Sequence, residues 1–383
     1  MTAGAGADAR LVSLDAFRGF AIAAMLLVNN PGDWSALYGP LGHAAWHGWT
    51  FTDWVFPFFV FISGISMSFS LARRGQAADR RVVLPHLWRR GATLILIGLL
   101  LNLFPGFQLE TLRIPGVLQR LGLITILAAP IALWCGWRAQ AGWLIGLLAA
   151  YTAIQLGVAV PDAQGVVHRG SLLPGQDVGA WLDRWLMDGH LWRTSKTWDP
   201  EGLLSTMPAV ASQIAGLLAG RWLALRGRDP AEKAMWFMVA GLGSLWLAQI
   251  LDAWSMPINK NLWTPAFVFM STGWGCLLFG VFYWLLDAAP LPRLRASMAA
   301  RVKPLVIFGM NALFLFALSG VVARLLSLIH VAQDLTLKGW LFAPLQRLAV
   351  DPRLASLLFA AGFVLVFYGV AWGLWRRGWF VKV

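Results

Sequence analysis

Charged residues are scarce in this chain, and this scarcity decides the class of protein. Asp, Glu, Lys and Arg make up 13% of the 383 residues, and hydrophobic residues make up 58%, whereas soluble domains carry roughly 25% charged residues. Many windows exceed ~18 mainly apolar residues, the length that spans a bilayer core as a helix. The runs are continuously apolar, which argues against the alternating strands of a membrane barrel. We therefore expect an all-α, polytopic transmembrane helical bundle.

Cysteines and cofactor-binding motifs are also nearly absent. Cys135 and Cys276 are the two cysteines of the sequence, and both lie in apolar segments without metal-ligand spacing, which predicts small buried side chains. There is no Walker loop, dinucleotide fingerprint, nucleophile elbow or zinc-protease helix. An enzyme of this kind would have to work with a few polar residues at the mouth of the bundle, and we expect no metal.

The net charge of +13 does not indicate nucleic-acid binding. The basic residues stand between apolar runs instead of forming a basic domain, as the positive-inside rule produces. Their distribution over the short loops places both termini in the cytoplasm, with a longer periplasmic loop at about 161–201. The runs predict ten spans: 14–31, 52–72, 90–105, 115–135, 141–160, 202–224, 233–252, 262–287, 304–328 and 354–375.

The domain organisation expected from this pattern is simple. Residues 1–9 lack the features of a cleaved signal and are expected to form a short disordered tail. Residues 10–383 contain no internal repeat or linker and are expected to form one transmembrane domain in the inner membrane. Two pairs of small residues, Gly142–Gly146 and Gly216–Gly220, predict close helix contacts.

Titratable residues stand at the outer end of the second span. His43 and His47 are four residues apart, and Asp53 opens the span. A neutral histidine suits a general base near pH 7, although a structural interface histidine is the alternative. The spacing of His43 and His47 would suit a metal only in a helix, and Gly42 and Gly48 argue against a helix there.

Two further clusters lie on the first span. Asp15 and Arg18 are three residues apart at its inner end, which favours either an ordinary helix-start ion pair or a contact from Arg18 to a phosphorylated ligand. Asn29 and Asn30 end the span, and helix capping explains one of these amides.

The remaining polar clusters flank later spans. Arg113, beside Glu110, can be an interfacial anchor, but Arg120 lies inside a span after Gln119 and is expected to pair with a carboxylate such as Asp53 or with a ligand. The stretch from Asp199 to Glu201 has the pattern of a helix start. Asn259, Lys260 and Asn261 suit either a helix cap or a surface for sugar hydroxyls.

Taken in order, these clusters resemble the heparan-α-glucosaminide N-acetyltransferase family of the transmembrane acyltransferase superfamily. The segments that carry the resemblance are RLVSLDAFRGFAIAAMLLVNN, HAAWHGWTFTDWVFPFFVFISG, RIPGVLQRLG, DPEGLLST and PINKNLW. The resemblance implies a compact bacterial relative that moves the acetyl group of cytoplasmic acetyl-CoA across the membrane. The acceptor it implies is the amino group of a glucosamine-type sugar on the outer face.

The resemblance also implies roles for particular residues. His43 matches the family's essential histidine, as general base or as acetyl acceptor, and Asn29 matches its partner asparagine. Asp53 would orient His43 or pair with Arg120. His47 departs from the family pattern and is a poor candidate. Further residues complete the predicted site. Those expected to bind acetyl-CoA are Arg18, Arg113, Gln119 and Arg120. Those expected to bind the sugar are Asp199, Glu201, Asn259, Lys260 and Asn261.

Two other functions stay open at this point. One is O-acylation of envelope glycans, since donor motifs need not fix the acceptor. The other is transport of sugars or lipid-linked sugars without chemistry, although no inverted repeat supports it. The sequence leaves open whether a homodimer forms. The expected partners are an amino sugar or glucosamine-terminated glycan and the lipid bilayer, with no nucleic acid.

Overall fold

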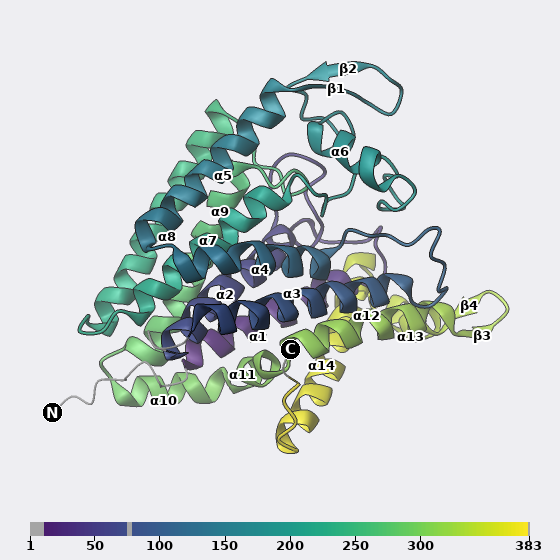
Figure 1. The fold of residues 1–383 in the computed structure, drawn as a ribbon. Helices are drawn as coiled ribbons and strands as arrows, with labels where there is room; N and C mark the ends of the chain where they lie inside the picture. Colours follow the sequence, from purple (N-terminus) through teal and green to yellow (C-terminus); the bar gives the residue numbers. More distant parts are fainter. Residues whose placement is uncertain (1–10, 75–78, 382–383) are drawn as a thin grey trace. The chain divides into compact units, whose positions relative to one another are not determined.

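The computed structural model describes residues 11–74 and 79–381, and the side chains of residues 73 and 74 are not described. The tail expected at residues 1–9 lies outside the described residues. Helices dominate the fold, as predicted (Figure 1). They are α1 (Val12–Asn29), α2 (Phe51–Arg74), α3 (Arg80–Leu103), α4 (Val117–Trp134), α5 (Trp137–Gly157), α6 (Val178–Met187), α7 (Thr206–Ala224), α8 (Pro230–Trp254), α9 (Pro265–Tyr283), α10 (Pro292–Arg301), α11 (Lys303–Met310), α12 (Ala312–Leu328), α13 (Leu337–Leu348) and α14 (Pro352–Arg376).

Short elements connect these helices. A 3₁₀ turn, η1, covers Gly39–Leu41, and a π-helical turn, η2, covers Trp284–Ala288 at the end of α9. Strand β1 (Ala159–Pro161) pairs with β2 (Val167–Arg169), and β3 (His330–Ala332) pairs with β4 (Leu335–Thr336), both antiparallel.

Each of the ten predicted spans coincides with helix in the structure. Among the described residues, eight helices are long and apolar enough to cross a bilayer, or nine if α11 and α12, which are bent by 79° at their junction, form one span. Helix α7 is not among them, although 202–224 was predicted to be a span. Its residues include Thr206, Ser212 and Gln213, which are buried, and a helix enclosed by protein needs less apolar surface than one that faces lipid.

Several boundaries differ from the prediction. Helix α3 begins at Arg80 instead of residue 90, so part of the expected basic loop is helical. The predicted loop at 161–201 contains α6 and the β1–β2 hairpin. The helix start predicted at 199–201 is wrong, since α7 begins at Thr206. Helices α10 and α13 are amphipathic or polar segments that the search for apolar spans did not find.

The chain divides into two compact units, which are described separately. In the described residues, unit 1 comprises 45–48 and 57–281, and unit 2 comprises 11–44, 49–56 and 282–381. Unit 1 packs α3 on α4, and packs α7 on both α4 and α5. Figure 1 shows α3 and α4 side by side, with the β1–β2 hairpin and α6 beyond one end of α5.

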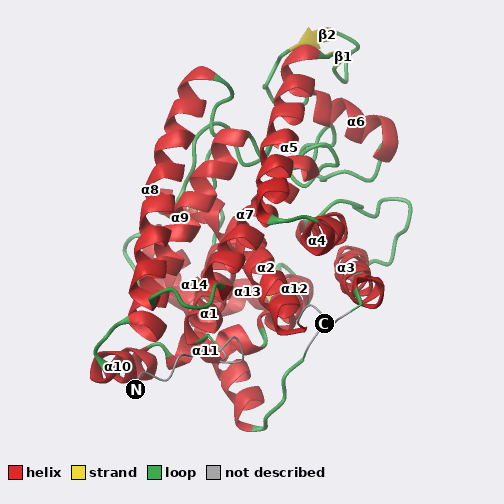
Figure 2. Ribbon diagram, turned by 60° about the vertical axis from the view of Figure 1, so that its left-hand side comes forward, coloured by secondary structure: helices red, strands yellow, loops and turns green. Residues whose placement is uncertain are grey.

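Glycines set two close helix contacts in unit 1. A Cβ on Gly216 would lie 2.2 Å from the backbone oxygen of Phe61 in α2, and one on Gly220 would lie 2.6 Å from Ser68 Cβ, so the predicted contact of this pair is confirmed. Gly142 and Gly146 have open space instead, so that predicted contact is wrong. Helices α8 and α9 lie side by side (Figure 2), in contact through Gly241 and Gly273.

Unit 2 is built around α1, which packs against α11, α12 and α14. A Cβ on Gly19 would lie 1.7 Å from the Leu305 carbonyl oxygen, so only glycine allows this approach of α1 and α11. The carboxylate of Asp287 accepts hydrogen bonds from the backbone N–H groups of Val12 and Ser13 and so caps α1.

The segment after α1 is anchored to α14 in the same unit. The side-chain amide of Asn30 donates to the Leu26 carbonyl and ends α1. Gly32 N–H donates to the Ser356 carbonyl, and Tyr38 Oη donates to Asp351. These bonds hold the connection that carries His43.

Candidate active site

His43 and Asp53 form a hydrogen-bonded pair within unit 2. His43 follows the η1 turn, Asp53 lies in the first turn of α2, and His43 Nδ1 is 2.6 Å from Asp53 Oδ1. The His43 side chain is 48% exposed, whereas the Asp53 side chain is 2% exposed. A buried carboxylate that accepts the Nδ1 proton leaves Nε2 as the basic nitrogen of a ring that solutes can reach.

The second oxygen of Asp53 is used by the start of α2. Asp53 Oδ2 accepts from Thr50 N–H at 3.0 Å, from Thr50 Oγ1 at 3.1 Å and from Ala44 N–H at 3.1 Å. Thr50 precedes Phe51, the first residue of α2, so the bond from Thr50 N–H to Asp53 is the carboxylate half of a capping box, while Asp53 N–H donates to the backbone oxygen of Thr50. The Thr-x-x-Asp pattern before an apolar run was a sequence signal for this arrangement, which the sequence analysis missed.

The other predicted residues of unit 2 lie on α1. Asn29 is the last residue of the helix and is exposed, whereas Asn30 is buried and supplies the cap. Arg18 Nη1 donates to Asp15 Oδ1 at 3.1 Å, the ion pair that the sequence favoured as one alternative. The amide of Asn29 is thus available to solutes at the end of α1.

In unit 1, Arg113 forms ion pairs with two residues that were predicted to bind the acceptor sugar, Asp199 and Glu201. Its Nε and Nη2 donate to the two oxygens of Asp199 at 2.8 and 2.6 Å, and Nη2 also lies 2.6 Å from Glu201 Oε2. Such a fork-to-carboxylate contact is strong and directional. Arg113 was predicted to bind CoA, and Asp199 and Glu201 to bind sugar. Any such contact would have to compete with the ion pairs that these three residues form with one another.

Arg120 is buried in α4, 1% exposed, as expected for a charge inside a span. Its Nη2 donates to the Gly202 carbonyl and to Ser205 Oγ, and its guanidinium lies 5.2 Å from the ring centroid of Trp263. Within the described residues its Nε and Nη1 have no hydrogen-bond partner, nor does the amide nitrogen of buried Gln119. Arg120 thus supports the turn before α7.

Asp183 of α6 belongs to the same cluster, and the sequence did not single it out. It is 2% exposed, and its Oδ1 accepts from Leu203 N–H at 2.9 Å. A Cβ on Gly202 would lie 2.0 Å from Asp183 Oδ2, so a side chain there would displace the carboxyl group. Nothing in the sequence around Asp183 distinguishes it from a surface residue of an amphipathic helix.

The charges of this cluster shift one another's pKa values. Burial raises the pKa of Asp183 to about 7. Burial also disfavours ionised Glu201, but the charges of Arg113, Arg120 and Lys260 outweigh it and lower the pKa of Glu201. The Arg113 pKa is raised, because its bonds to Asp199 and the charge of Glu201 outweigh burial.

The residues before α9 organise their own loop. Asn259 is fully buried, its Oδ1 accepts from Leu262 N–H, and its Nδ2 donates to His47 Nδ1 at 3.3 Å. Leu262 precedes α9, which begins at Pro265, so Asn259 stabilises the loop before the helix. Lys260 and Asn261 are partly exposed.

Comparisons with known proteins address the family. Residues 10–171 match the family model described as heparan-alpha-glucosaminide N-acetyltransferase, catalytic, a range that contains His43, Asp53 and Asn29. The chain is 29% identical to the heparan-alpha-glucosaminide N-acetyltransferase of Homo sapiens over 335 residues, and 28% identical to that of Mus musculus over 337 residues. The predicted family resemblance is confirmed.

Both alignments cover only part of each relative. Each alignment covers 74% of this chain and 50% of the relative. The chain thus spans about half the length of the curated relatives it matches.

The predicted residues are distributed over both units. His43 and Asp53 are in contact, and they share unit 2 with Asn29 and Arg18. The other predicted residues belong to unit 1, and they are Arg113, Gln119, Arg120, Asp199, Glu201, Asn259, Lys260 and Asn261. No group of three or more His, Cys, Asp or Glu side chains that could hold a metal occurs in the described part of the chain.

Proposed function

We propose that this protein is a membrane-embedded acetyltransferase. Acetyl-CoA from the cytoplasm is the acetyl donor, and the acceptor is the amino group of a glucosamine-type sugar on the outer face. The family relationship and the apolar spans support this reading. The observation that carries it is the pairing of half-exposed His43 with buried Asp53.

The pair has the chemistry that acyl transfer to an amine requires. The amine nitrogen attacks the thioester carbonyl carbon, the new C–N bond forms, and the C–S bond breaks to release CoA. His43 Nε2 takes the proton that the amine loses and returns it to the leaving thiolate. Asp53 accepts the hydrogen bond from Nδ1–H and stabilises the imidazolium that forms, as a carboxylate does for a catalytic histidine.

Other residues receive more limited roles. Asn29 is exposed at the end of α1 and is proposed to orient His43 or to donate to the thioester oxygen. Arg18 keeps its predicted contact with the CoA phosphates. Arg113, Asp199 and Glu201 are proposed to shape the turn before α7, because they already bond one another.

An alternative route has His43 as the acetyl acceptor. The imidazole then attacks the thioester, CoA leaves, and the sugar amine takes the acetyl group in a second step. Both routes need a neutral His43 and predict the same products. They differ in whether CoA is released before the sugar binds.

Thiol release from acetyl-CoA in the presence of glucosamine tests the proposal. Purified full-length protein in detergent is expected to release CoA and form N-acetylglucosamine. His43→Ala is expected to lower turnover at least ~100-fold, since general acid–base catalysis contributes roughly 10²–10⁴-fold. His47→Ala is the matched control, four residues away on the same loop, and should keep most of the activity.

The outcomes separate the enzyme from the residue assignment. Turnover that survives in a folded His43→Ala protein would refute the role of His43 and leave the acetyltransferase. No thiol release with any amino sugar tested would refute N-acetyl transfer, and O-acylation or transport would then have to be considered. CoA release without any sugar, in one burst per chain, would favour the acetyl-histidine route.

A further inference from the structure

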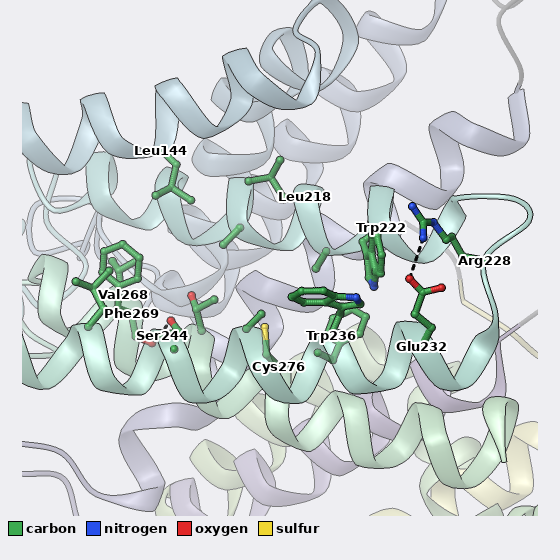
Figure 3. A pocket seen from close by; sticks show the side chains of 17 residues that line it. Leu144, Leu218, Trp222, Arg228, Glu232, Trp236, Ser244, Val268, Phe269 and Cys276 are labelled. Atoms are coloured by element: carbon green, nitrogen blue, oxygen red, sulfur yellow. Dashed lines mark hydrogen bonds and ion pairs between the residues drawn. The ribbon is translucent and has the colours of Figure 1, made fainter.

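A cavity of about 780 Å³ lies in unit 1, away from the residues assigned to catalysis. It is formed by α7, α8 and α9 with a contribution from α5, and its lining side chains are mostly apolar (Figure 3). The volume falls within the range of ligand sites, roughly 300–1,000 Å³. None of the predicted donor or acceptor residues lines it, so the proposed acetyl transfer does not account for it.

The helices that border the cavity place it within the bilayer. Helices α5, α8 and α9 are each long and apolar enough to span a membrane. Only 22% of the α8 span and 28% of the α5 span are buried inside the protein, compared with 61% of the α9 span. Apolar helices with so few buried residues are expected to face lipid, which would place the cavity beside the hydrocarbon of the membrane.

The length of the cavity suits an extended hydrocarbon chain. Its lining on α8 runs from Glu232 in the first turn to Leu247. These residues are about 22 Å apart along the helix axis at ~1.5 Å per residue. One leaflet of hydrocarbon is about 15 Å deep, half of the ~30 Å core. An acyl chain that enters at the α8 N-terminus therefore fits along the cavity.

One end of the cavity is polar, and its charges come as a pair. Arg228 Nη1 lies 3.0 Å from Glu232 Oε1, with the side chains 56% and 30% exposed. The rings of Trp222 and Trp236 pack edge to face beside them, 6.4 Å apart. Figure 3 shows these four side chains gathered at one end, with Leu144 and Phe269 toward the other. Tryptophan favours the headgroup level of a membrane, which matches this end.

We propose that the cavity binds one phospholipid of the surrounding bilayer, with a zwitterionic amine headgroup. The acyl chain lies along α8, the phosphate contacts Arg228, and the ammonium donates to Glu232. The charge pair selects this chemistry. An anionic headgroup without an amine would bring its charge to Glu232, and a choline headgroup has no N–H to donate.

Gly243 offers a way to fill the cavity without disturbing the backbone. It lines the cavity, and a Cβ built on it meets no atom within 4 Å. Gly243→Phe should therefore occupy the space of the acyl chain. Leu242 is the matched control position, because it is the preceding residue of α8, is 61% exposed and does not line the cavity.

Native mass spectrometry of the full chain in detergent tests the proposal. The delipidated protein is incubated with phosphatidylethanolamine, phosphatidylcholine or phosphatidylglycerol of identical acyl chains. The wild type is expected to retain one phosphatidylethanolamine, at least about tenfold more tightly than the others, as one charge-assisted hydrogen bond allows. Gly243→Phe should lose this binding and Leu242→Phe should keep it, while Glu232→Gln should abolish the preference over phosphatidylcholine.

Three results would overturn the proposal. Equal retention of the three lipids would remove the headgroup assignment. Undiminished binding by Gly243→Phe would place the lipid elsewhere on the protein. A dimer that is lost in Gly243→Phe but not in Leu242→Phe would mean that a second copy of the chain covers this face.

Discussion

Asp53 serves two purposes with its two carboxylate oxygens. Oδ2 accepts from Thr50 N–H at the start of α2, as a capping carboxylate does at any helix start, and Oδ1 is hydrogen-bonded to His43. The bonds to Oδ2 thus hold the carboxylate in the position from which Oδ1 contacts the imidazole. A residue with an ordinary structural explanation can therefore also carry the proposed chemistry.

Asp183 illustrates the opposite case, a carboxyl whose environment disfavours its charge. It is buried in unit 1, and its raised pKa of about 7 reflects this burial together with the nearby carboxylates of Asp199 and Asp177. An unfolded chain would ionise Asp183 near its ordinary pKa of 3.8. Between these two values the folded protein holds a proton that the unfolded chain has lost, so stability falls as the pH rises through this window.

Replacement of Asp183 tests this dependence. Asp183→Asn keeps an oxygen that can accept from Leu203 N–H but removes the titration. The wild type should lose up to about 1.4 kcal/mol of stability per pH unit between roughly pH 4 and 7 from this group. Thermal unfolding in detergent at pH 5 and pH 8 should thus show a smaller difference for the variant. Equal differences in the two proteins would contradict a buried, protonated Asp183.

At the scale of elements, small residues matter only where two helices meet. Gly216 and Gly220 of α7 touch α2, because α7 is enclosed in unit 1, whereas Gly142 and Gly146 of α5 face open space. The two pairs have the same spacing in the sequence. Their neighbours in space decide which one is a contact.

Alanine at the two positions should therefore have opposite consequences. Gly216→Ala would push a methyl group against the Phe61 carbonyl and is expected to destabilise the protein by about 1–3 kcal/mol, as overpacking does. Gly142→Ala should be neutral or stabilise by up to about 1 kcal/mol, because alanine is the better helix former. Thermal unfolding of both variants in the same detergent provides the comparison. Similar melting temperatures for the two would show that the α2–α7 contact is less tight than described.

At the scale of the whole molecule, the number of spans determines the topology. Over the described residues, the ten predicted spans coincide with eight apolar helices, the bent pair α11–α12 and α7, which is itself not apolar enough to be counted as a span. If all ten segments cross the bilayer, as predicted, both termini lie on one side, and the basic residues favour the cytoplasm. The orientation itself remains a prediction of the charge distribution.

Accessibility of single cysteines to a membrane-impermeant maleimide tests the orientation. Gln164, in the β1–β2 hairpin, and Ser297, in α10, are both exposed and belong to loops predicted on opposite sides. Gln164→Cys should be labelled in cells with a permeabilised outer membrane, and Ser297→Cys only after the inner membrane is opened. The unsubstituted protein controls for Cys135 and Cys276. Labelling of Ser297→Cys before the inner membrane is opened would contradict the proposed topology.

The sequence by itself determined the class of fold and the resemblance to a family, since both depend on local patterns. Continuous apolar runs predict helices wherever they pack, and the ordered motifs around His43 predict the family without coordinates. The capping box at Thr50 and Asp53 was also readable, because it involves neighbours in the chain.

Only the tertiary structure decided which polar residues are used by the fold. Arg113 and Asp199 are 86 positions apart yet bond directly, and Asp183 joins them from a helix with no distinguishing signal. The apolar cavity beside α8 likewise depends on how α5, α7, α8 and α9 pack. The physical reason is that burial and ion pairing are properties of neighbours in space, which local sequence patterns do not specify.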